Sequence, residues 1–132
     1  MSSTLQTPPP KSSSYILTHP SPHVLLITIN RPAAMNSIPS HAHWEADAIF
    51  TWFDAEPSLR TAIITGAGTK SFCAGQDLIE QARFKIDPPP ASSRRHPPSG
   101  FAGVSRRVGK KPVIAAVNGF ALGGGFEICL NW

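Results

Sequence analysis

Two short apolar segments, each followed by a glycine-containing turn, limit this chain to a small set of folds. Residues 61–65 have the sequence Thr-Ala-Ile-Ile-Thr and end at Gly66, and residues 112–117 (Pro-Val-Ile-Ala-Ala-Val) end at Asn118-Gly119. Apolar runs of this length, bounded by turn residues, are typical of buried strands. Residues with helical spacing lie between the expected strands, so the sequence predicts an α/β fold with short crossover connections.

The segment before these strands predicts two more strands. Residues 15–18 form a short strand candidate, and a proline-rich turn separates them from residues 24–30. In the second segment Leu25, Ile27 and Ile29 alternate with other residues, which predicts that these three side chains share one buried face.

A helix is expected from about His41 to Ala55, with Ser40 as its N-cap. Apolar side chains recur there at helical spacing and predict a core-facing stripe made of Trp44, Ala48, Ile49, Trp52 and Phe53. Shorter helices are expected over residues 101–109 and from about residues 123–125 onward.

Two segments have compositions that oppose regular structure. Residues 1–13 are rich in Ser, Thr and Pro and predict a disordered leader. Residues 85–100 contain two proline clusters among Ser and Arg, which predicts a loop. The folded unit is therefore expected over residues 14–132. No apolar run approaches the roughly 18–20 residues that a membrane-spanning helix needs, so no membrane span is expected.

The positive charge of the chain is concentrated in one stretch. The formal net charge is +4, and the basic residues of this stretch are Arg83, Lys85, Arg94, Arg95, Arg106, Arg107, Lys110 and Lys111. Such a cluster attracts polyanions, either nucleic acid or the phosphates of a small ligand, or it belongs to a solvated loop. Because the stretch has few aromatic residues and many prolines, no nucleic-acid binding is expected.

The histidines do not predict a metal site. His41 and His43 come closest to a ligand pair, but residues two apart on a helix point in different directions. No metal is therefore expected.

Two glycine-containing segments carry the candidate chemistry. Residues 71–78 have the sequence Ser-Phe-Cys-Ala-Gly-Gln-Asp-Leu, and residues 118–127 have the sequence Asn-Gly-Phe-Ala-Leu-Gly-Gly-Gly-Phe-Glu. Each leads toward a helix, whose first N–H groups lack intrahelical partners and suit a negatively charged oxygen. Two such donors that converge would form an oxyanion hole. The alternative is that the glycines only permit close packing against a neighbouring strand.

Both segments in this order, separated by residues 111–117, resemble the crotonase (enoyl-CoA hydratase/isomerase) superfamily. Residues 27–32, followed by Met35-Asn36, are similar to the opening motif of that family. The resemblance runs from about Ser14 to Trp132. It implies an α/β fold of the crotonase type, a spiral of ββα units, and an enzyme that stabilises the enolate of a thioester.

The resemblance also implies roles for individual residues. The main-chain N–H groups of Gln76 and Gly124 would hold the thioester oxygen of an acyl-CoA, and Glu127 would orient or activate water. Residues matching the substrate-binding positions are Arg31, Ala33, Ala34, Ala74, Gly75, Asp77 and Gly123. Basic side chains such as Arg83 and Lys85 would lie near the nucleotide phosphates. Coenzyme A is part of the substrate in this family, so no separate cofactor is expected.

The chain ends after the glycine-rich turn and the start of the following helix, whereas members of this family continue. The resemblance therefore implies that a second catalytic glutamate and the C-terminal helices that support trimers or hexamers are missing from residues 1–132. Two functions remain open: an acyl-CoA enzyme of the hydratase/isomerase type, or an inactive homologue that binds coenzyme A or assists assembly. The family resemblance suggests a mitochondrial or peroxisomal location, and the cytoplasm if no signal is present.

Overall fold

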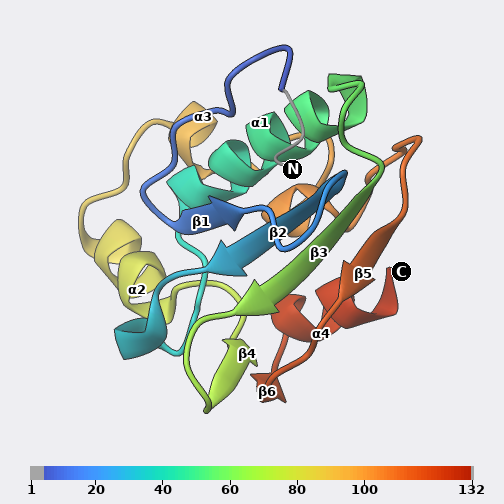
Figure 1. Cartoon of the computed structure of the whole chain (residues 1–132). Helices are drawn as coiled ribbons and strands as arrows, with labels where there is room; N and C mark the ends of the chain where they lie inside the picture. The colour runs from blue at the N-terminus through green and yellow to red at the C-terminus, as the bar shows by residue number, and fades with distance from the viewer. Residues whose placement is uncertain (1–4, 132) are drawn as a thin grey trace.

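The computed structural model describes residues 5–131, in which four strands form one mixed sheet in the order β1-β2-β3-β5. Strand β1 (Tyr15–Thr18) pairs with β2 (Val24–Ile29) in antiparallel fashion. Strands β3 (Thr61–Gly66) and β5 (Val113–Ala115) then add in parallel, so that the sheet seen in Figure 1 has β1 at one edge and β5 at the other. The four predicted strands are all present.

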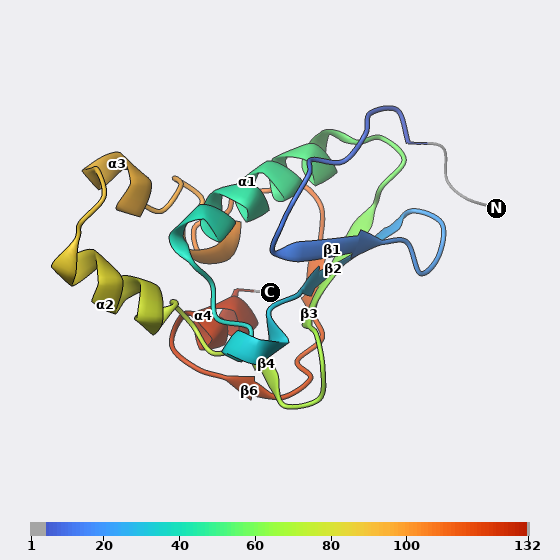
Figure 2. The same ribbon diagram turned by 90° about the vertical axis from the view of Figure 1, so that its left-hand side faces the viewer.

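The helices lie on one face of this sheet, as the view along its edge shows (Figure 2). Leu25, Ile27 and Ile29 point toward that face and are at most 1% exposed, which confirms the alternation predicted for β2. Strand β5 was expected to be buried, but Ile114 is 54% exposed. The reason is that β5 lies at the edge of the sheet, and no helix within residues 5–131 covers its outer face (Figure 1).

Helix α1 (Ser40–Ala55) connects β2 to β3 and packs on the sheet. Its buried residues are Ser40, Ala42, His43, Ala46, Ile49, Phe50 and Phe53. The predicted stripe was correct at Ile49 and Phe53 but wrong at Trp44 and Ala48, which are exposed, while Trp52 is half-buried. The tryptophans lie at the flanks of the helix, where the indole N–H of each reaches an oxygen acceptor in a neighbouring segment.

The start of α1 also differs by one residue from the prediction. Pro39 occupies the N-cap position, and Ser40 is the first helical residue. The main-chain N–H and the hydroxyl of Ser40 both donate to the Glu80 carboxylate, at 2.7 Å each. A side chain from another helix therefore satisfies the donor that a cap would have satisfied.

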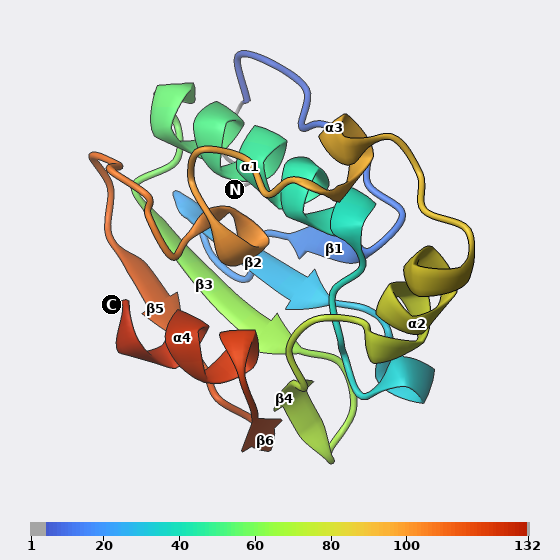
Figure 3. The same cartoon turned by 180° about the vertical axis from the view of Figure 1, so that it is seen from behind.

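A second, smaller sheet consists of two very short parallel strands, β4 (Ser71–Cys73) and β6 (Phe120–Ala121). Each leads into a helix, α2 (Leu78–Ile86) after β4 and α4 (Gly124–Leu130) after β6. The chain thus repeats one unit, β3-β4-α2 and then β5-β6-α4, which Figure 3 shows side by side. This repeat is the ββα arrangement that the family resemblance implied, although strands of two and three residues gave no sequence pattern of their own.

The connection between the two units is mostly irregular, with short helical turns. A single turn, α3 (Ala91–Arg94), lies within the proline- and arginine-rich segment 85–100. The helix expected over residues 101–109 is wrong beyond its first turn: η2 (Phe101–Gly103) is a 3-10 helix. It ends because Ala102 and Gly103 both have positive φ, 52° and 68°, which an α-helix cannot continue. The other 3-10 turn, η1 (Pro32–Ala34), follows β2.

Two residues of the basic cluster stabilise the end of α1 rather than face a ligand. The ammonium group of Lys111 donates to the main-chain oxygens of Phe53 and Glu56, and thus satisfies carbonyls of the last helical turn. The Arg107 guanidinium forms an ion pair with Asp54 on the same helix. A linear charge count could not distinguish these two residues from the others.

Residues 5–13, which belong to the segment expected to be disordered, lie along α1; residues 1–4 are outside the described part of the chain. The Glu56 carboxylate accepts hydrogen bonds from the N–H of Gln6 at 2.8 Å and from the N–H and hydroxyl of Thr7. Glu45 accepts from Ser13 in the same way. Between residues 5 and 131, no helix is long and apolar enough to cross a bilayer.

The contacts of Glu56 predict a pH-dependent attachment of this leader. The N–H of Gln6, followed by the donors of Thr7 and Ser58, outweighs burial and lowers the pKa of Glu56 from 4.5 to about 2. A carboxylate with a depressed folded-state pKa stabilises the fold above its unfolded pKa and loses that effect as the pH falls. The unfolding free energy of the wild type should therefore exceed that of Glu56→Gln near neutrality, and the difference should shrink between about pH 4.5 and about pH 2. A difference that stays constant over that range would contradict this account.

Candidate active site

The parallel pairing of β4 and β6 brings the two glycine-containing turns together. Ser71 pairs with Phe120 and Cys73 with Ala121, and the N–H of Leu122 donates to the Cys73 carbonyl at 3.0 Å. The carboxyl ends of parallel strands lie at the same edge of a sheet. The residues that follow β4 and those that follow β6 therefore meet, although about fifty positions separate them in the sequence.

The glycines of these turns have separate roles. Gly75 and Gly123 have φ angles of 96° and 54°, a region that favours glycine. A β-carbon on Gly75 would lie 2.9 Å from the Leu122 carbonyl oxygen, and one on Gly124 would lie 2.5 Å from the Phe101 ring. A β-carbon on Gly125 would collide with the Cys73 carbonyl. Close packing thus favours glycine at both 124 and 125, and it does not involve the main-chain N–H of Gly124.

Several main-chain N–H groups in these turns donate to no acceptor within residues 5–131, and those of Gln76 and Gly124 are among them. The N–H of Ile38 donates to Gly75 and the N–H of Asp77 donates to Ile38, at 2.8 and 3.1 Å. Successive N–H groups of an extended chain point to opposite sides, so the N–H of Gln76 points away from Ile38. Gly124 is the first residue of α4, where an N–H has no intrahelical partner. Among the hydrogen bonds of residues 5–131, none has either N–H as its donor.

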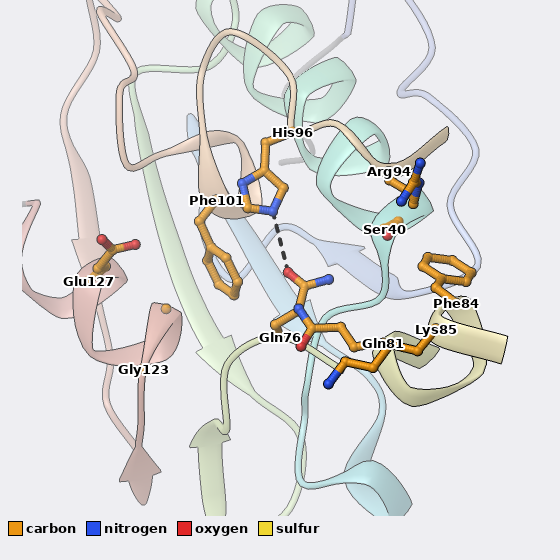
Figure 4. Close-up of a pocket in the computed structure, with 11 residues that line it drawn as sticks. Ser40, Gln76, Gln81, Phe84, Lys85, Arg94, His96, Phe101, Gly123 and Glu127 are labelled. Atoms are coloured by element: carbon orange, nitrogen blue, oxygen red, sulfur yellow. Dashed lines mark hydrogen bonds between the residues drawn. The ribbon is translucent and has the colours of Figure 1, made fainter. Parts of the chain in front are cut away.

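Both residues line a cleft of about 830 Å³, shown in Figure 4. Gln76 comes from the turn after β4 and Gly123 from the turn before α4, while Gly124 and Glu127 belong to the first turn of α4. The other lining residues are Ser40, Gln81, Phe84, Lys85, Arg94, His96 and Phe101. The structure therefore gathers the three predicted catalytic residues, Gln76, Gly124 and Glu127, around one cavity.

The charges around the cleft are mainly positive. Lys85 and Arg94 line it from α2 and α3, and Arg83, which the sequence proposed beside Lys85, is not among the lining residues. Glu127 is the one carboxylate among the described lining residues, and it is exposed. The cleft thus combines main-chain donors, one carboxylate, and basic side chains at the α2–α3 side, which suits a ligand with anionic groups.

Of the predicted substrate-binding residues, Gly123 lines the cleft, and the others are not among its lining residues. Arg31 forms an ion pair with Asp77 at 3.2 Å, and Asp77 caps α2 by accepting from the N–H groups of Ile79 and Glu80. Burial raises the pKa of Asp77, but these donors and Arg31 outweigh it and hold the pKa below its ordinary value.

Four predicted substrate-binding positions remain. Ala33 and Ala34 belong to η1, and the N–H of Ala74 donates to the Met35 carbonyl at 3.1 Å. Gly75 is packed against the residues that precede α4. Contact of these residues with substrate stays a prediction.

His43 is the residue that sequence reasoning missed. It is fully buried in α1 beneath the cleft, where its Nδ1 accepts the N–H of Ala102 at 2.8 Å and its Nε2 lies 2.9 Å from the Gln76 side-chain oxygen. Burial lowers the pKa of His43 to about 4, so the ring is neutral near pH 7. The sequence offered His43 only as a weak metal ligand, and residues 5–131 contain no cluster of three or more metal-ligating side chains.

Comparisons with known proteins point in one direction. A sequence model of the enoyl-CoA hydratase/isomerase family matches residues 20–131. A mevalonyl-coenzyme A hydratase of Beauveria bassiana is 51% identical over 92% of this chain and 45% of its own length. A carnitinyl-CoA dehydratase of Escherichia coli is 47% identical over 81% of this chain and 39% of its own.

Solved structures agree with the sequence matches. The crystal structure of a carnitinyl-CoA hydratase from Mycobacterium avium superposes with a TM-score of 0.77 at 38% identity, covering 92% of this chain and 44% of that one. The chain therefore spans less than half of the length of the relatives that it matches.

The burial of His43 predicts how stability changes with pH. Its pKa is about 4 in the fold against 6.5 as a free side chain. Between these values the unfolded chain binds a proton that the folded chain does not, so the unfolding free energy falls as the pH drops from about 6.5 to about 4. Chemical denaturation at a series of pH values should show a shallower fall for His43→Gln. The matched change at the exposed His19, His19→Gln, should keep the wild-type slope. Equal slopes for His43→Gln and wild type would contradict the burial of a neutral ring.

Proposed function

Because the chain belongs to the enoyl-CoA hydratase/isomerase family, we propose that it carries the thioester-binding part of a hydratase that adds water to, or removes it from, an acyl-CoA. The observation that supports this proposal is the pair of unpartnered N–H groups, of Gln76 and Gly124, which line one cleft together with Glu127.

The proposed role of the two N–H groups follows from the charge that the reaction develops. When water adds to the double bond of a 2-enoyl thioester, the electrons of that bond shift onto the thioester oxygen and form an enolate. Fixed donors aimed at that oxygen stabilise the transition state without any reorganisation, and the loss of one donor typically costs about 3–4 kcal/mol. Gln76 and Gly124 supply main-chain donors, which no side-chain substitution removes directly.

Glu127 is the proposed acid–base group of this cleft. Its carboxylate accepts a proton from water as the water oxygen bonds to C3, and the protonated Glu127 then gives that proton to C2 of the enolate, so that one water molecule is added and the carboxylate is regenerated. Dehydration follows the same steps in reverse. General acid–base catalysis of this kind contributes about 10²- to 10⁴-fold to a rate. Coenzyme A enters as part of the substrate, and the proposal requires no separate cofactor.

The relatives suggest where to look for the substrate. The Beauveria bassiana protein is named for mevalonyl-coenzyme A and the Escherichia coli protein for carnitinyl-CoA. We take the mevalonyl thioester as the first candidate for this chain and a plain 2-enoyl-CoA as the reference. The basic side chains Lys85 and Arg94 are available for the phosphates of the coenzyme A portion.

The exchange of Glu127 tests the chemistry. Hydration consumes the conjugated enoyl thioester, so its ultraviolet absorbance reports turnover directly. Glu127→Gln should lower kcat/KM by about 10²-fold or more. The matched control is Asp87→Asn, which removes an exposed carboxylate that does not line the cleft and should leave the rate within about twofold of wild type. A Glu127→Gln variant as active as wild type would refute the role of this residue.

A second candidate function is non-catalytic: the chain binds an acyl-CoA without turning it over, or it assists the assembly of a relative. The observation that favours it is a set of exposed apolar side chains on and around β6 and α4, namely Phe120, Leu122, Phe126 and Leu130, each at least 54% exposed. Acyl-CoA binding that is equal in wild type and Glu127→Gln, with no turnover by either, would support this alternative.

A further inference from the structure

The side chain of Gln76 is held in one orientation by a chain of hydrogen bonds that begins at the main chain. The N–H of Ala102 donates to Nδ1 of His43, so in the neutral ring the proton is on Nε2. That Nε2–H donates to the Gln76 side-chain oxygen at 2.9 Å. His96 approaches the same oxygen at 3.3 Å, the bond marked in Figure 4.

This arrangement fixes which atom of the Gln76 amide faces the cleft. If the amide turned over, its NH₂ group would face the His43 Nε2–H, and two donors would oppose each other. The ring of His43 has no room to move away, because it is fully buried, with its centre 4.6 Å from that of Phe101 and 4.2 Å from that of His96. The oxygen therefore stays on the histidine side.

The amide nitrogen of Gln76 is left as a free donor in the cleft. Figure 4 shows it on the side of the amide away from His96. Among the hydrogen bonds of residues 5–131, none has this nitrogen as its donor, and Gln76 lines the cavity. Nonpolar ligand atoms placed against it would leave its N–H groups unpaired, whereas an oxygen would accept from them.

We propose that the Gln76 side-chain amide, oriented by His43, selects acyl-CoA ligands whose acyl chain carries an oxygen acceptor over alkyl chains of the same length. This inference rests on the proposed function, because the main-chain N–H of the same residue is the proposed thioester donor. The amide therefore lies within one side-chain length of the thioester carbon. The ligands compared below share the coenzyme A portion, so a difference in their affinities locates the acceptor in the acyl chain.

The selectivity arises from an unpaired donor. A site built to hydrogen-bond one polar group discriminates against an analogue that lacks this group, because the protein's own polar atom then stays desolvated without a partner. Such discrimination is typically on the order of 10- to 100-fold for one neutral hydrogen bond. His43 is a positioning residue in this proposal, since it touches Gln76 and not the ligand.

Two saturated thioesters test the proposal without any turnover. 4-Methoxybutanoyl-CoA and hexanoyl-CoA have acyl chains of equal length and differ by an ether oxygen in place of one CH₂. 5-Methoxypentanoyl-CoA and heptanoyl-CoA place the oxygen one atom further along. Titration calorimetry on the full chain should give, for at least one pair, an ether that binds about 10-fold more tightly than its alkyl partner. Because both members contain coenzyme A, the ratio reports only on the acyl chain.

Substitutions distinguish the role of the Gln76 amide as the donor from the role of His43, which orients that amide. Gln76→Met keeps the length of the side chain and removes the donor, so the preference for the ether should fall to about onefold or reverse. His43→Leu frees the amide to turn and should reduce the preference, while His43→Gln, which retains a donor toward Gln76, should restore part of it. If a substitution at the buried His43 prevents folding, Gln76→Met still decides the selectivity, because it removes the donor without altering His43.

The possible results distinguish a failure of the proposed acyl-chain selectivity from a failure of acyl-CoA binding itself. Equal binding of ether and alkyl thioesters by wild type, or an undiminished preference in Gln76→Met, would overturn the selectivity while leaving acyl-CoA binding in place. Failure to bind any of the four thioesters would overturn the proposed function and the inference together.

Discussion

The parallel pairing of β4 with β6 is the contact on which the candidate site depends. Two strands of three and two residues contribute little stability, but their register fixes which residues meet at their carboxyl ends. Asn118 secures this arrangement from one side: its amide nitrogen donates to Gly68 and Ser71, and its oxygen accepts the N–H of Gly66. Asn36 donates to the Ser71 carbonyl from the other side. Side-chain hydrogen bonds from Asn36 and Asn118 therefore support the turn geometry in addition to the ladder.

This arrangement assigns distinct tasks to neighbouring residues. Gly125 packs against β4, Gly123 makes the turn, and Gly124 between them keeps a main-chain N–H without a protein acceptor. Gln76 has a comparable position after β4, and its side chain adds a second donor of fixed orientation. We propose that the two main-chain donors serve the thioester oxygen and that the side chain reads the acyl group, so that one residue links the chemistry to substrate choice.

The sequence predicted those features that local pattern encodes. Alternation at Leu25, Ile27 and Ile29 located a strand and its buried face, and the two glycine segments located the turns that line the cleft. The family resemblance, and not periodicity, selected Gln76, Gly124 and Glu127 from among many polar and glycine residues. That selection agrees with the structure in one respect: all three residues line the same cavity.

The features that the sequence did not predict depend on contacts between distant residues. In α1 the indole N–H groups of Trp44 and Trp52 find acceptors in neighbouring segments, and Trp44 is exposed while Trp52 packs half-buried at the edge of the core. In the sequence Lys111 is one of several neighbouring basic residues, but in the fold it caps α1, which lies fifty-five or more positions away. His43 looks like a surface histidine until Ala102 and Gln76 are brought to its two nitrogens. A linear pattern holds no information on such pairings, which exist only after the chain has folded.

The central claim is that the N–H groups of Gln76 and Gly124 donate to one thioester oxygen, and vibrational spectroscopy of the bound thioester tests it most directly. A 2-enoyl-CoA labelled with ¹³C at the thioester carbonyl identifies the relevant stretching band in an isotope-difference spectrum. Two hydrogen bonds from fixed donors polarise the carbonyl, so the account predicts that this band shifts to lower frequency on binding, relative to the same thioester in water. A bound thioester whose carbonyl band stays at its solution frequency would contradict the claim.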